Sequence, residues 1–256
     1  MREQRRWAAL DRFRPSGRRL RSHFLFEVNG STVAYCYIRK NACSAFKRMI
    51  LDQAGYTGQW NGAISYLTSN FAAPSVQAVR AARWRVFVYR DPFERMASLF
   101  RNKMIMQEGA GDFLNDFKRV TGFDPGDATF EQFVHLYLAR GPHDPHALSQ
   151  AAHLLPVSYN ICSTMDSLRD DMTQVVGDEL AARYFVRPVN QSSASLFEEP
   201  SFEVPVRVLR QRYAETGELP GSAALDSTEV RSAVLRLYRV DYSLASRYEK
   251  TSKREA

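Results

Sequence analysis

The sequence predicts an α/β protein with a mainly parallel central sheet flanked by helices and an N-terminal β-hairpin. Short β-branched and aromatic runs alternate along the chain with segments of helical periodicity. The first two runs, residues 24–28 and 31–38, flank Asn29 and Gly30, the dipeptide typical of a two-residue hairpin turn. A later run, residues 83–90, is short and nearly continuously apolar, as expected of a strand buried on both faces in a parallel sheet.

The remaining elements follow from spacing and from capping residues. Phe46, Met49 and Ile50 recur at helical spacing after the second run. Asp91 is a good helix N-cap, and Pro92 suits the first helical position. We therefore expect a strand at 159–163 and helices at 44–53, 91–104, 130–139, 167–176 and 227–249, the last interrupted near Asp241.

Composition indicates an ordinary globular protein with an anionic partner. The chain has 256 residues, of which 45% are hydrophobic, enough for a full core in one domain that we place at 23–256. Its formal net charge is +7, which favours phosphate, sulfate, nucleic acid or an acidic glycan as the bound group. An arginine-rich arm at 1–22 precedes the domain, and a solvated or frayed basic tail is its plainer interpretation.

Cysteine usage and hydropathy predict the compartment. Cys36, Cys43 and Cys162 are odd in number and lack metal-type spacing, which argues against a disulfide framework or a zinc finger. No apolar run approaches the roughly 18 residues that span a bilayer. We expect a protein without a transmembrane segment in a reducing, cytoplasmic setting.

Two strand-to-helix junctions carry hydroxyl and basic residues suited to an anion. Helix N-termini present unpaired backbone N–H groups and the positive end of the helix dipole. In the first junction Lys40 adds an ammonium group and Ser44 a hydroxyl, while Ala42 and Ala45 allow close backbone approach. The junction lacks the G-x-x-x-x-G-K-[ST] pattern, so a magnesium-dependent nucleotide hydrolase is disfavoured.

The second junction begins with Arg90, whose planar guanidinium suits phosphate oxygens. Taken alone, Arg90 could instead form a structural ion pair, Ser98 could be an ordinary helix serine, and Lys40 could be surface charge. The helix that follows has two faces, an apolar one at Phe93, Ala97, Phe100 and Met104 and a polar, ligand-facing one at Asp91, Arg95, Ser98 and Asn102.

The two junctions together are more specific than either alone. IRKNACSAFKRMI, followed some forty residues later by VFVYRDPFERMASLFRNK, resembles the paired donor-binding motifs of sulfotransferases that use 3′-phosphoadenosine 5′-phosphosulfate (PAPS). The similarity is closest to the carbohydrate sulfotransferases of the chondroitin and dermatan 4-O type, sulfotransferase family 2, with their P-loop-like fold. It implies PAPS as donor, 3′-phosphoadenosine 5′-phosphate (PAP) as product, and a donor site made of Arg39, Lys40, Asn41, Ala42, Cys43, Ser44, Ala45, Phe46, Arg90, Ser98, Asn190 and Ser192.

Within that set the resemblance implies that different residues bind the two ends of the donor. Lys40, Ser44 and the backbone between them would meet the 5′ end of the donor, and Arg90 and Ser98 the 3′-phosphate. Members in higher organisms are membrane-anchored Golgi proteins, so the absence of an anchor here favours a soluble, bacterial-type member.

Some positions depart from the family pattern. Arg39 stands where the family often has proline, and Phe46 where it has tryptophan. The related uronyl 2-O enzymes carry a catalytic histidine in a stretch similar to NGAISYL, where this chain has Asn61 and Ala63. The base must therefore be sought elsewhere.

For catalysis we assign Lys40 and His146. An ammonium group stabilises the charge that grows on the bridging oxygen of the leaving phosphate, the role given to Lys40. In the family a D-x-H segment followed by glutamine resembles DPHALSQ, which places Asp144, His146 and Gln150 on that pattern and makes His146 the candidate general base. Glu94 or Asp144 could take the proton instead.

The other histidines fit less well. His23 precedes the first strand, and His135 lies in an apolar helical pattern. His143, His146 and His153 could suggest zinc, but Pro142 and Pro145 interrupt the loop and no cysteine or acidic motif completes a ligand set. We expect no catalytic metal.

The predicted function is transfer of a sulfuryl group from PAPS to a hydroxyl of a carbohydrate or glycoconjugate, without a nucleic-acid partner. One alternative is a sulfotransferase for a small phenolic or lipid acceptor. Another is a non-enzymatic basic anion-binding module that works through its N-terminal arginines. The sequence gives no expectation for the acceptor's identity or the oligomeric state.

Overall fold

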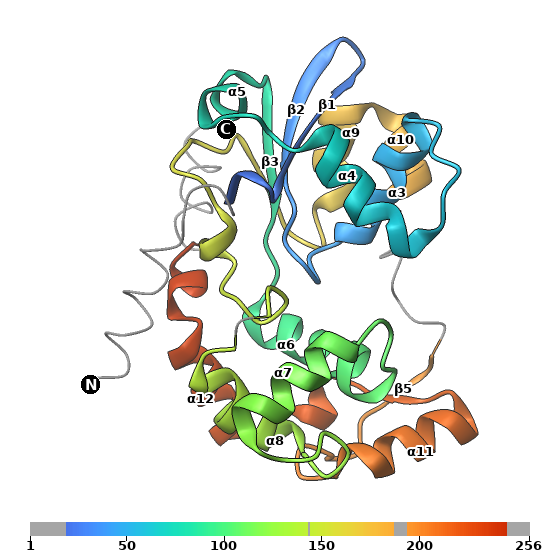
Figure 1. The fold of residues 1–256 in the computed structure, drawn as a ribbon, viewed down its shortest axis with the longest axis vertical. Helices are drawn as coiled ribbons and strands as arrows, with labels where there is room; N and C mark the ends of the chain where they lie inside the picture. The colour runs from blue at the N-terminus through green and yellow to red at the C-terminus, as the bar shows by residue number, and fades with distance from the viewer. Residues whose placement is uncertain (1–18, 143, 187–193, 245–256) are drawn as a thin grey trace. The chain divides into compact units, whose positions relative to one another are not determined.

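The computed structural model describes residues 19–142, 144–186 and 194–244, which fall into two compact units (Figure 1). Unit 1 contains the described residues up to Arg90 and those from Gln150 to 186. Unit 2 contains the described residues from Asp91 to Ser149 and from 194 onward. Within the described residues the chain thus crosses between the units at 90–91 and at 149–150. Most of the predicted basic arm lies outside the described residues, and the single domain at 23–256 stays a prediction.

Unit 1 is built on a four-stranded sheet in the order β1-β2-β3-β4. β1 and β2 form the predicted antiparallel hairpin, with His23 paired to Cys36 and Val28 to Ser31. The turn residues Asn29 and Gly30 both have positive φ, 49° and 67°, as a type I′ turn requires. β2 pairs with β3, and β3 with β4, in parallel. The strands are β1 (His23–Val28), β2 (Ser31–Cys36), β3 (Trp84–Val88) and β4 (Ile161–Ser163).

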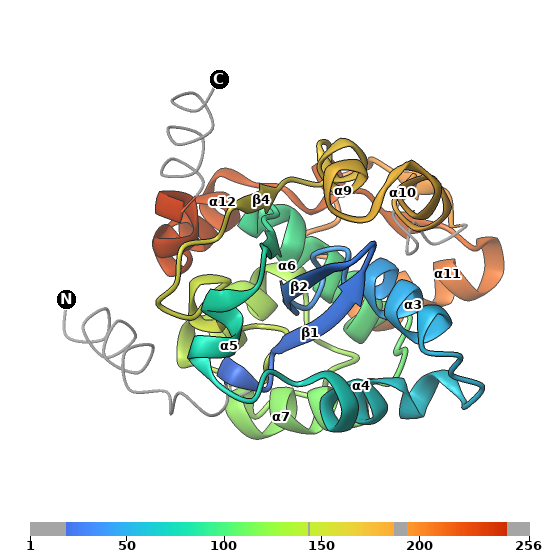
Figure 2. The same cartoon turned by 90° about the horizontal axis from the view of Figure 1, so that it is seen from above.

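Helices cover both faces of this sheet. Successive side chains along β2 point to opposite faces and belong to two different apolar clusters, so both faces are buried. Val33 and Tyr35 belong to one cluster, which Phe46 completes from α3. Ala34 belongs to the other cluster, with Val79 of α5. In Figures 1 and 2, α3, α9 and α10 lie away from α5. The helical elements of unit 1 are α3 (Cys43–Gln53), the 3₁₀ turn η1 (Trp60–Gly62), α4 (Ala63–Phe71), α5 (Val76–Ala81), the 3₁₀ turn η5 (Ala151–His153), α9 (Leu168–Val176) and α10 (Asp178–Tyr184).

Unit 2 is mostly helical. Its core is rich in phenylalanine, and Phe100 packs against Phe130 and Phe133 at ring distances of 5.0 and 5.5 Å. The predicted apolar face of the 91–104 helix, from Phe93 to Met104, is fully buried in this core. The elements are α6 (Pro92–Phe100), η2 (Arg101–Ile105), α7 (Gly111–Thr121), α8 (Phe130–Gln132), η3 (Phe133–Tyr137), η4 (Leu138–Arg140), β5 (Leu196–Phe197), α11 (Val206–Thr216), β6 (Leu219–Pro220), η6 (Ala223–Leu225) and α12 (Thr228–Leu237).

The α/β class, the hairpin and the mainly parallel sheet are confirmed. The cap of α6 is also confirmed, since the Asp91 carboxylate accepts from the N–H groups of Phe93 and Glu94 at 2.9 and 3.1 Å. The ligand-facing polar stripe on that helix is wrong at Arg95, whose side chain is wholly buried. Buried guanidinium groups need acceptors, and Arg95 finds them in backbone carbonyls within unit 2.

Candidate active site

The connection from β2 to α3 holds its backbone in an unusual conformation. Lys40 and Ala42 have φ angles of 70° and 52°, although neither is glycine. Among the described residues, only Asn29 and Gln107 are other non-glycine positions with positive φ. Each such residue costs about 1 kcal/mol or more, because its Cβ crowds a carbonyl oxygen. A loop with two of them needs contacts elsewhere to fix it.

Those contacts come from two wholly buried side-chain amides, Asn41 and Gln150. Asn41 Nδ2 donates to the carbonyl oxygen of Val88 at 2.7 Å and to Gln150 Oε1 at 2.5 Å. Gln150 Oε1 also accepts from the N–H of Arg90 at 3.0 Å, and its Nε2 donates to the Arg90 carbonyl at 2.8 Å. Arg90 Nη1 in turn donates to the Lys40 carbonyl at 3.0 Å. The loop and the end of β3 therefore belong to one hydrogen-bonded network.

The first turn of α3 suits an anion. Its N-cap is Ala42, no side chain caps it, and no acidic residue lies in the turn. The positive end of the helix dipole is therefore not offset by a carboxylate of that turn. Ser44 is half-buried there and carries a hydroxyl that can donate to an oxygen. A group with several anionic oxygens fits these donors.

Three of the predicted donor-site residues contact aromatic groups. The Arg39 guanidinium lies 5.6 Å from the ring centroid of Tyr37. Phe46 is buried and stacks on Tyr35 with ring centroids 3.8 Å apart, so its ring belongs to the core. Cys43 hydrogen-bonds Tyr37, and burial together with this neighbour raises the pKa of the Tyr37 phenol, which stays neutral. Of these three, Arg39 and Cys43 keep partly exposed side chains.

His146, the predicted base, is paired with a carboxylate in unit 2. Its Nδ1 lies 2.6 Å from Asp144 Oδ1, and its backbone N–H donates to the same oxygen at 2.7 Å. An ionised carboxylate only accepts, so Nδ1 carries the proton and Nε2 is the basic nitrogen of the neutral ring. The His146 side chain is 23% exposed, and a proton donor can therefore approach it.

The backbone around His146 is held by buried side chains of unit 2. Arg95 donates from Nη2 to the carbonyl of His146 at 3.0 Å and from Nη1 to that of Leu148 at 2.7 Å. The Tyr238 hydroxyl donates to the carbonyl between them, of Ala147, at 2.6 Å. Three successive carbonyls are thus fixed.

The remaining predicted residues have diverse settings. Ser98 is half-buried on α6. Glu94, an alternative base, accepts from the Ser222 hydroxyl at 2.7 Å. Asn190 and Ser192 lie outside the described residues, as does His143.

The structure therefore brings part of the predicted set together. Lys40, Asn41, Ser44 and Arg90 lie in unit 1, on the loop, the start of α3 and the end of β3. Ser98 and His146 belong to unit 2.

His23 has a structural role rather than a catalytic one. It is wholly buried, with Nδ1 bonded to the Arg19 carbonyl and Nε2 to the Tyr159 hydroxyl, both at 2.7 Å. Burial lowers the pKa of His23 to about 4. Because a carbonyl oxygen only accepts, Nδ1 carries the proton of the neutral ring and Nε2 accepts from the Tyr159 hydroxyl, which itself accepts from the Leu155 N–H at 2.9 Å.

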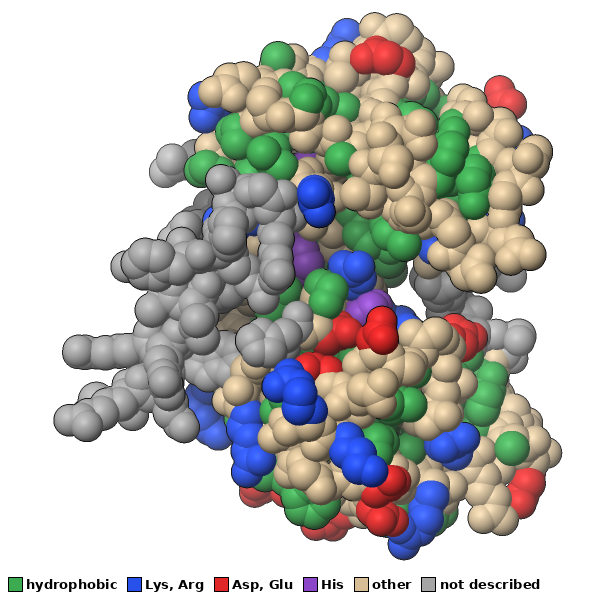
Figure 3. Space-filling view, in the orientation of Figure 1, with side chains coloured by type: hydrophobic (Ala, Val, Ile, Leu, Met, Phe, Trp, Pro, Cys, Tyr) green, Lys and Arg blue, Asp and Glu red, His purple; other side chains and the backbone are tan. Residues whose placement is uncertain are grey.

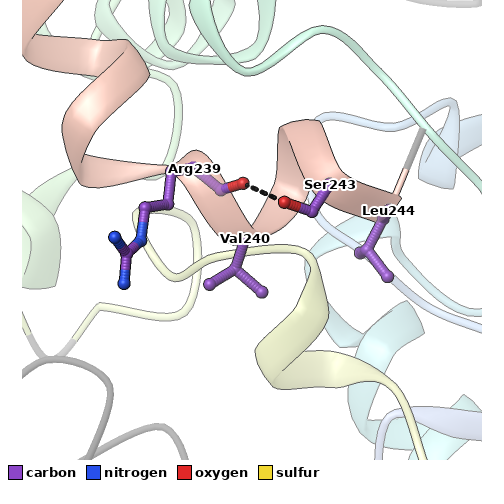
Figure 4. Close-up of a pocket in the computed structure, with 4 residues that line it drawn as sticks. All are labelled: Arg239, Val240, Ser243 and Leu244. Atoms are coloured by element: carbon purple, nitrogen blue, oxygen red, sulfur yellow. Dashed lines mark hydrogen bonds between the residues drawn. The ribbon is translucent and has the colours of Figure 1, made fainter. Parts of the chain in front are cut away.

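Other features of the described residues do not form a second site. They contain no group of three or more His, Cys, Asp or Glu side chains able to hold a metal ion. An open pocket of unit 2 is lined by Arg239, Val240, Ser243 and Leu244, with one ionisable side chain among them (Figure 4). Basic and acidic side chains are interspersed over the face of unit 2 in Figure 3. No helix in the described ranges is long and apolar enough to cross a membrane.

Comparison with known proteins decides the family. Residues 23–244 match the family model described as "Sulfotransferase family". The chain belongs to the sulfotransferase family. It is 22% identical over 240 residues to carbohydrate sulfotransferase 11 of Danio rerio, an alignment covering 81% of this chain and 62% of that protein. No solved structure matches the chain significantly. The α/β unit with its mainly parallel sheet agrees with the family's fold.

Sequence reasoning missed the roles of Gln150 and Arg95. Gln150 entered only as part of the DPHALSQ pattern, and Arg95 only as a member of a polar stripe. A wholly buried glutamine or arginine has no periodic signature of its own, because its partners are backbone groups far away in sequence.

Proposed function

We propose that this sulfotransferase family member transfers a sulfuryl group from PAPS to a hydroxyl of a carbohydrate or glycoconjugate. One observation carries the proposal: the strained loop before the uncapped α3 is tied through Asn41 and Gln150 to Arg90. The donor has anionic groups at both its 5′ and 3′ ends, and this network holds an anion-binding helix start and an arginine together.

The residues of unit 1 fit the donor's two ends. Lys40, Ser44 and the first N–H groups of α3 would hold the 5′-phosphosulfate, and the Arg90 guanidinium the 3′-phosphate. When bound, PAPS supplies the sulfuryl group that passes to the acceptor oxygen and leaves as PAP. Ser98, Asn190 and Ser192 stay proposed contacts, on the resemblance alone.

Two side chains carry the chemistry in this proposal. The Lys40 ammonium stabilises the negative charge on the oxygen that bridges to the 5′-phosphate. His146 Nε2 accepts the acceptor's hydroxyl proton, while Asp144 holds Nδ1–H and so fixes the tautomer. We propose no metal in this step, because a positioned ammonium can neutralise the leaving phosphate.

An exposed indole in unit 1 supports a sugar acceptor. The Trp60 side chain is 45% exposed, which is unusual for so large a ring. Lys47 Nζ lies 3.6 Å from its ring centroid and the Arg48 guanidinium 5.1 Å. Lys47 and Arg48 follow Ser44 on α3 by three and four residues, so they lie one helical turn from the loop. Together they present a partly exposed aromatic ring with positive charge over it, and that charge suits an acidic sugar.

The first experiment is an assay of the purified chain with sulfur-labelled PAPS and a panel of acceptors. The panel contains a uronic-acid polysaccharide, a neutral oligosaccharide, a phenol and a sterol. We expect label on the polysaccharide, and a higher acceptor KM in Trp60→Ala with the donor KM unchanged.

Other outcomes favour the alternatives. Label only on the phenol or sterol would replace the sugar acceptor by a small one. No transfer, with equal binding of PAP and of adenosine 5′-phosphate, would leave a basic anion-binding module. A cytoplasmic location stays a prediction, supported by the three free thiols at Cys36, Cys43 and Cys162.

A further inference from the structure

We propose that Gln150 is a positioning residue that holds the two donor-binding segments of unit 1 in a fixed arrangement before the donor binds. Its amide joins the loop after β2 to the end of β3, so Arg90 is presented in a fixed place relative to Lys40. This inference rests on the proposed donor site and adds a residue for which that site has no contact role.

The Gln150 amide behaves as a peptide group inserted at the end of the sheet. Its Oε1 accepts from the N–H of Arg90 and its Nε2 donates to the carbonyl of the same residue. One amide thus satisfies both backbone groups of Arg90, as a neighbouring strand would. The backbone pairing between β2 and β3 ends at Tyr35 and Val86. Beyond that point the side-chain amides of Asn41 and Gln150 bind the backbone of β3 and of Arg90.

The same amide reaches the loop through Asn41. Gln150 Oε1 also accepts from Asn41 Nδ2, and Asn41 Nδ2 donates further to the Val88 carbonyl. Asn41 Oδ1 is buried and has no hydrogen-bond partner in the part of the chain that the structure describes. Asn41 is therefore held by what its Nδ2 donates, and Gln150 receives one of those bonds. Loss of the Gln150 amide would release both Asn41 and the backbone of Arg90.

This arrangement matters for the guanidinium of Arg90. Arg90 Nη1 donates to the Lys40 carbonyl, inside the stretch of positive φ angles. Recognition of a phosphate by a guanidinium fork depends on direction as well as charge. If the backbone at Arg90 were freed, the guanidinium would keep its charge but would no longer be held in one orientation. The preference for a 3′-phosphate would then fall more than overall anion binding.

The test compares dissociation constants for PAP and adenosine 5′-phosphate, measured by calorimetry on the full chain. Gln150→Met keeps length and shape but removes the amide. We expect the preference for PAP to fall by about tenfold. In an Arg90→Ala background, Gln150→Met should have almost no further effect on the preference for PAP, because the guanidinium that Gln150 positions is already absent.

Asn160→Ala is the matched control. The Asn160 amide accepts from the N–H of Arg85 at 2.7 Å and donates to the carbonyl of Arg83 at 2.8 Å, at the opposite end of β3. It should lower the melting temperature and leave the PAP preference unchanged. An unchanged preference in Gln150→Met, or an equal loss with and without Arg90, would reduce Gln150 to a structural residue and overturn the inference.

A second variant and the wild-type affinities cover the remaining outcomes. If Gln150→Met does not fold, Asn41→Ala removes the other end of the bridge and should also reduce the PAP preference; an unchanged preference there overturns the inference. If the wild-type chain binds both nucleotides equally, the proposed donor site itself fails, and the inference with it. A wild-type preference that survives every amide variant rejects the role of Gln150 alone.

Discussion

At the scale of single residues, Lys40 combines a costly backbone conformation with a charged side chain. A non-glycine residue at a φ of 70° is maintained only where its surroundings fix it. Glycine would adopt this conformation freely. The chain nevertheless carries lysine there, which is understandable if the ammonium is required at this place in the loop. Backbone strain and charge can be separated by substitution.

Replacing Lys40 by Ala should lower kcat much more than it raises the donor KM, because the charge that Lys40 meets exists mainly in the transition state. Lys40→Gly should lose the same activity yet unfold with a free energy about 1 kcal/mol higher than Lys40→Ala, since glycine relieves the positive φ. Steady-state kinetics and urea unfolding measure both. A change confined to KM would leave Lys40 a binding residue only.

His146 and Asp144 should act as a pair. His146→Ala should lower kcat by about a hundredfold or more and remove the acidic limb of its pH profile, because the neutral imidazole is the proton acceptor. Asp144→Asn should lower kcat less and keep a limb, since the base remains but its tautomer is no longer fixed. The profiles are measured at saturating donor and acceptor. Wild-type kcat with an unaltered limb in His146→Ala would direct attention to a carboxylate such as Glu94.

At the scale of elements, the start of β1 is anchored by a neutral histidine. His23 bridges the Arg19 carbonyl and the Tyr159 hydroxyl inside unit 1. Because burial lowers its folded-state pKa from 6.5 to about 4, the unfolded chain binds a proton more readily than the folded one between these values. The stabilisation is fully present above pH 6.5 and is lost as the pH falls toward 4.

We expect protonation of His23 to lower the free energy of unfolding by roughly 3 kcal/mol as the pH falls from 6.5 to 4. His23→Asn keeps a polar side chain without the titration, so its stability should vary less over that interval. Urea unfolding at a series of pH values gives the comparison. The same slope in both proteins would mean that other groups cause the acid sensitivity.

Elements with local signals could be predicted from the sequence, and those that depend on distant contacts could not. Asn29 and Gly30 specify their turn, and Asp91 with Pro92 specifies the start of α6, within a few residues. The helix expected to continue through 104 instead ends at Phe100 and passes into the π-helical turn η2. β5 and β6 have two residues each, too few for any alternation to show.

The candidate site divides in the same way. The loop, Lys40 and Arg90 could be recognised because basic and hydroxyl residues at strand-to-helix junctions have a local chemical meaning. The buried tie through Gln150 joins positions 60 residues apart, and the tie through Arg95 joins α6 to a loop 51 residues later. Only the folded chain makes these pairs neighbours.

At the scale of the whole molecule, the chain crosses between its two compact units at 90–91 and 149–150 within the described residues. The residues on the unit 1 side of these two described crossings, Arg90 and Gln150, are hydrogen-bonded to each other. Two connections to unit 2 therefore leave from one point, beside the proposed donor loop. The net charge of +7 adds a general attraction for anions, but attraction alone would not distinguish a 3′-phosphate.

The measurement that tests the account most directly is the affinity of the full chain for PAP and for adenosine 5′-phosphate, in the wild type and in Arg90→Ala. A charge-assisted hydrogen bond contributes about 1.5–3 kcal/mol, so the wild type should prefer PAP by about tenfold or more, and Arg90→Ala should lose most of that preference while still binding adenosine 5′-phosphate. Equal wild-type affinities, or an undiminished preference in Arg90→Ala, would contradict the assignment of this network as the PAPS site.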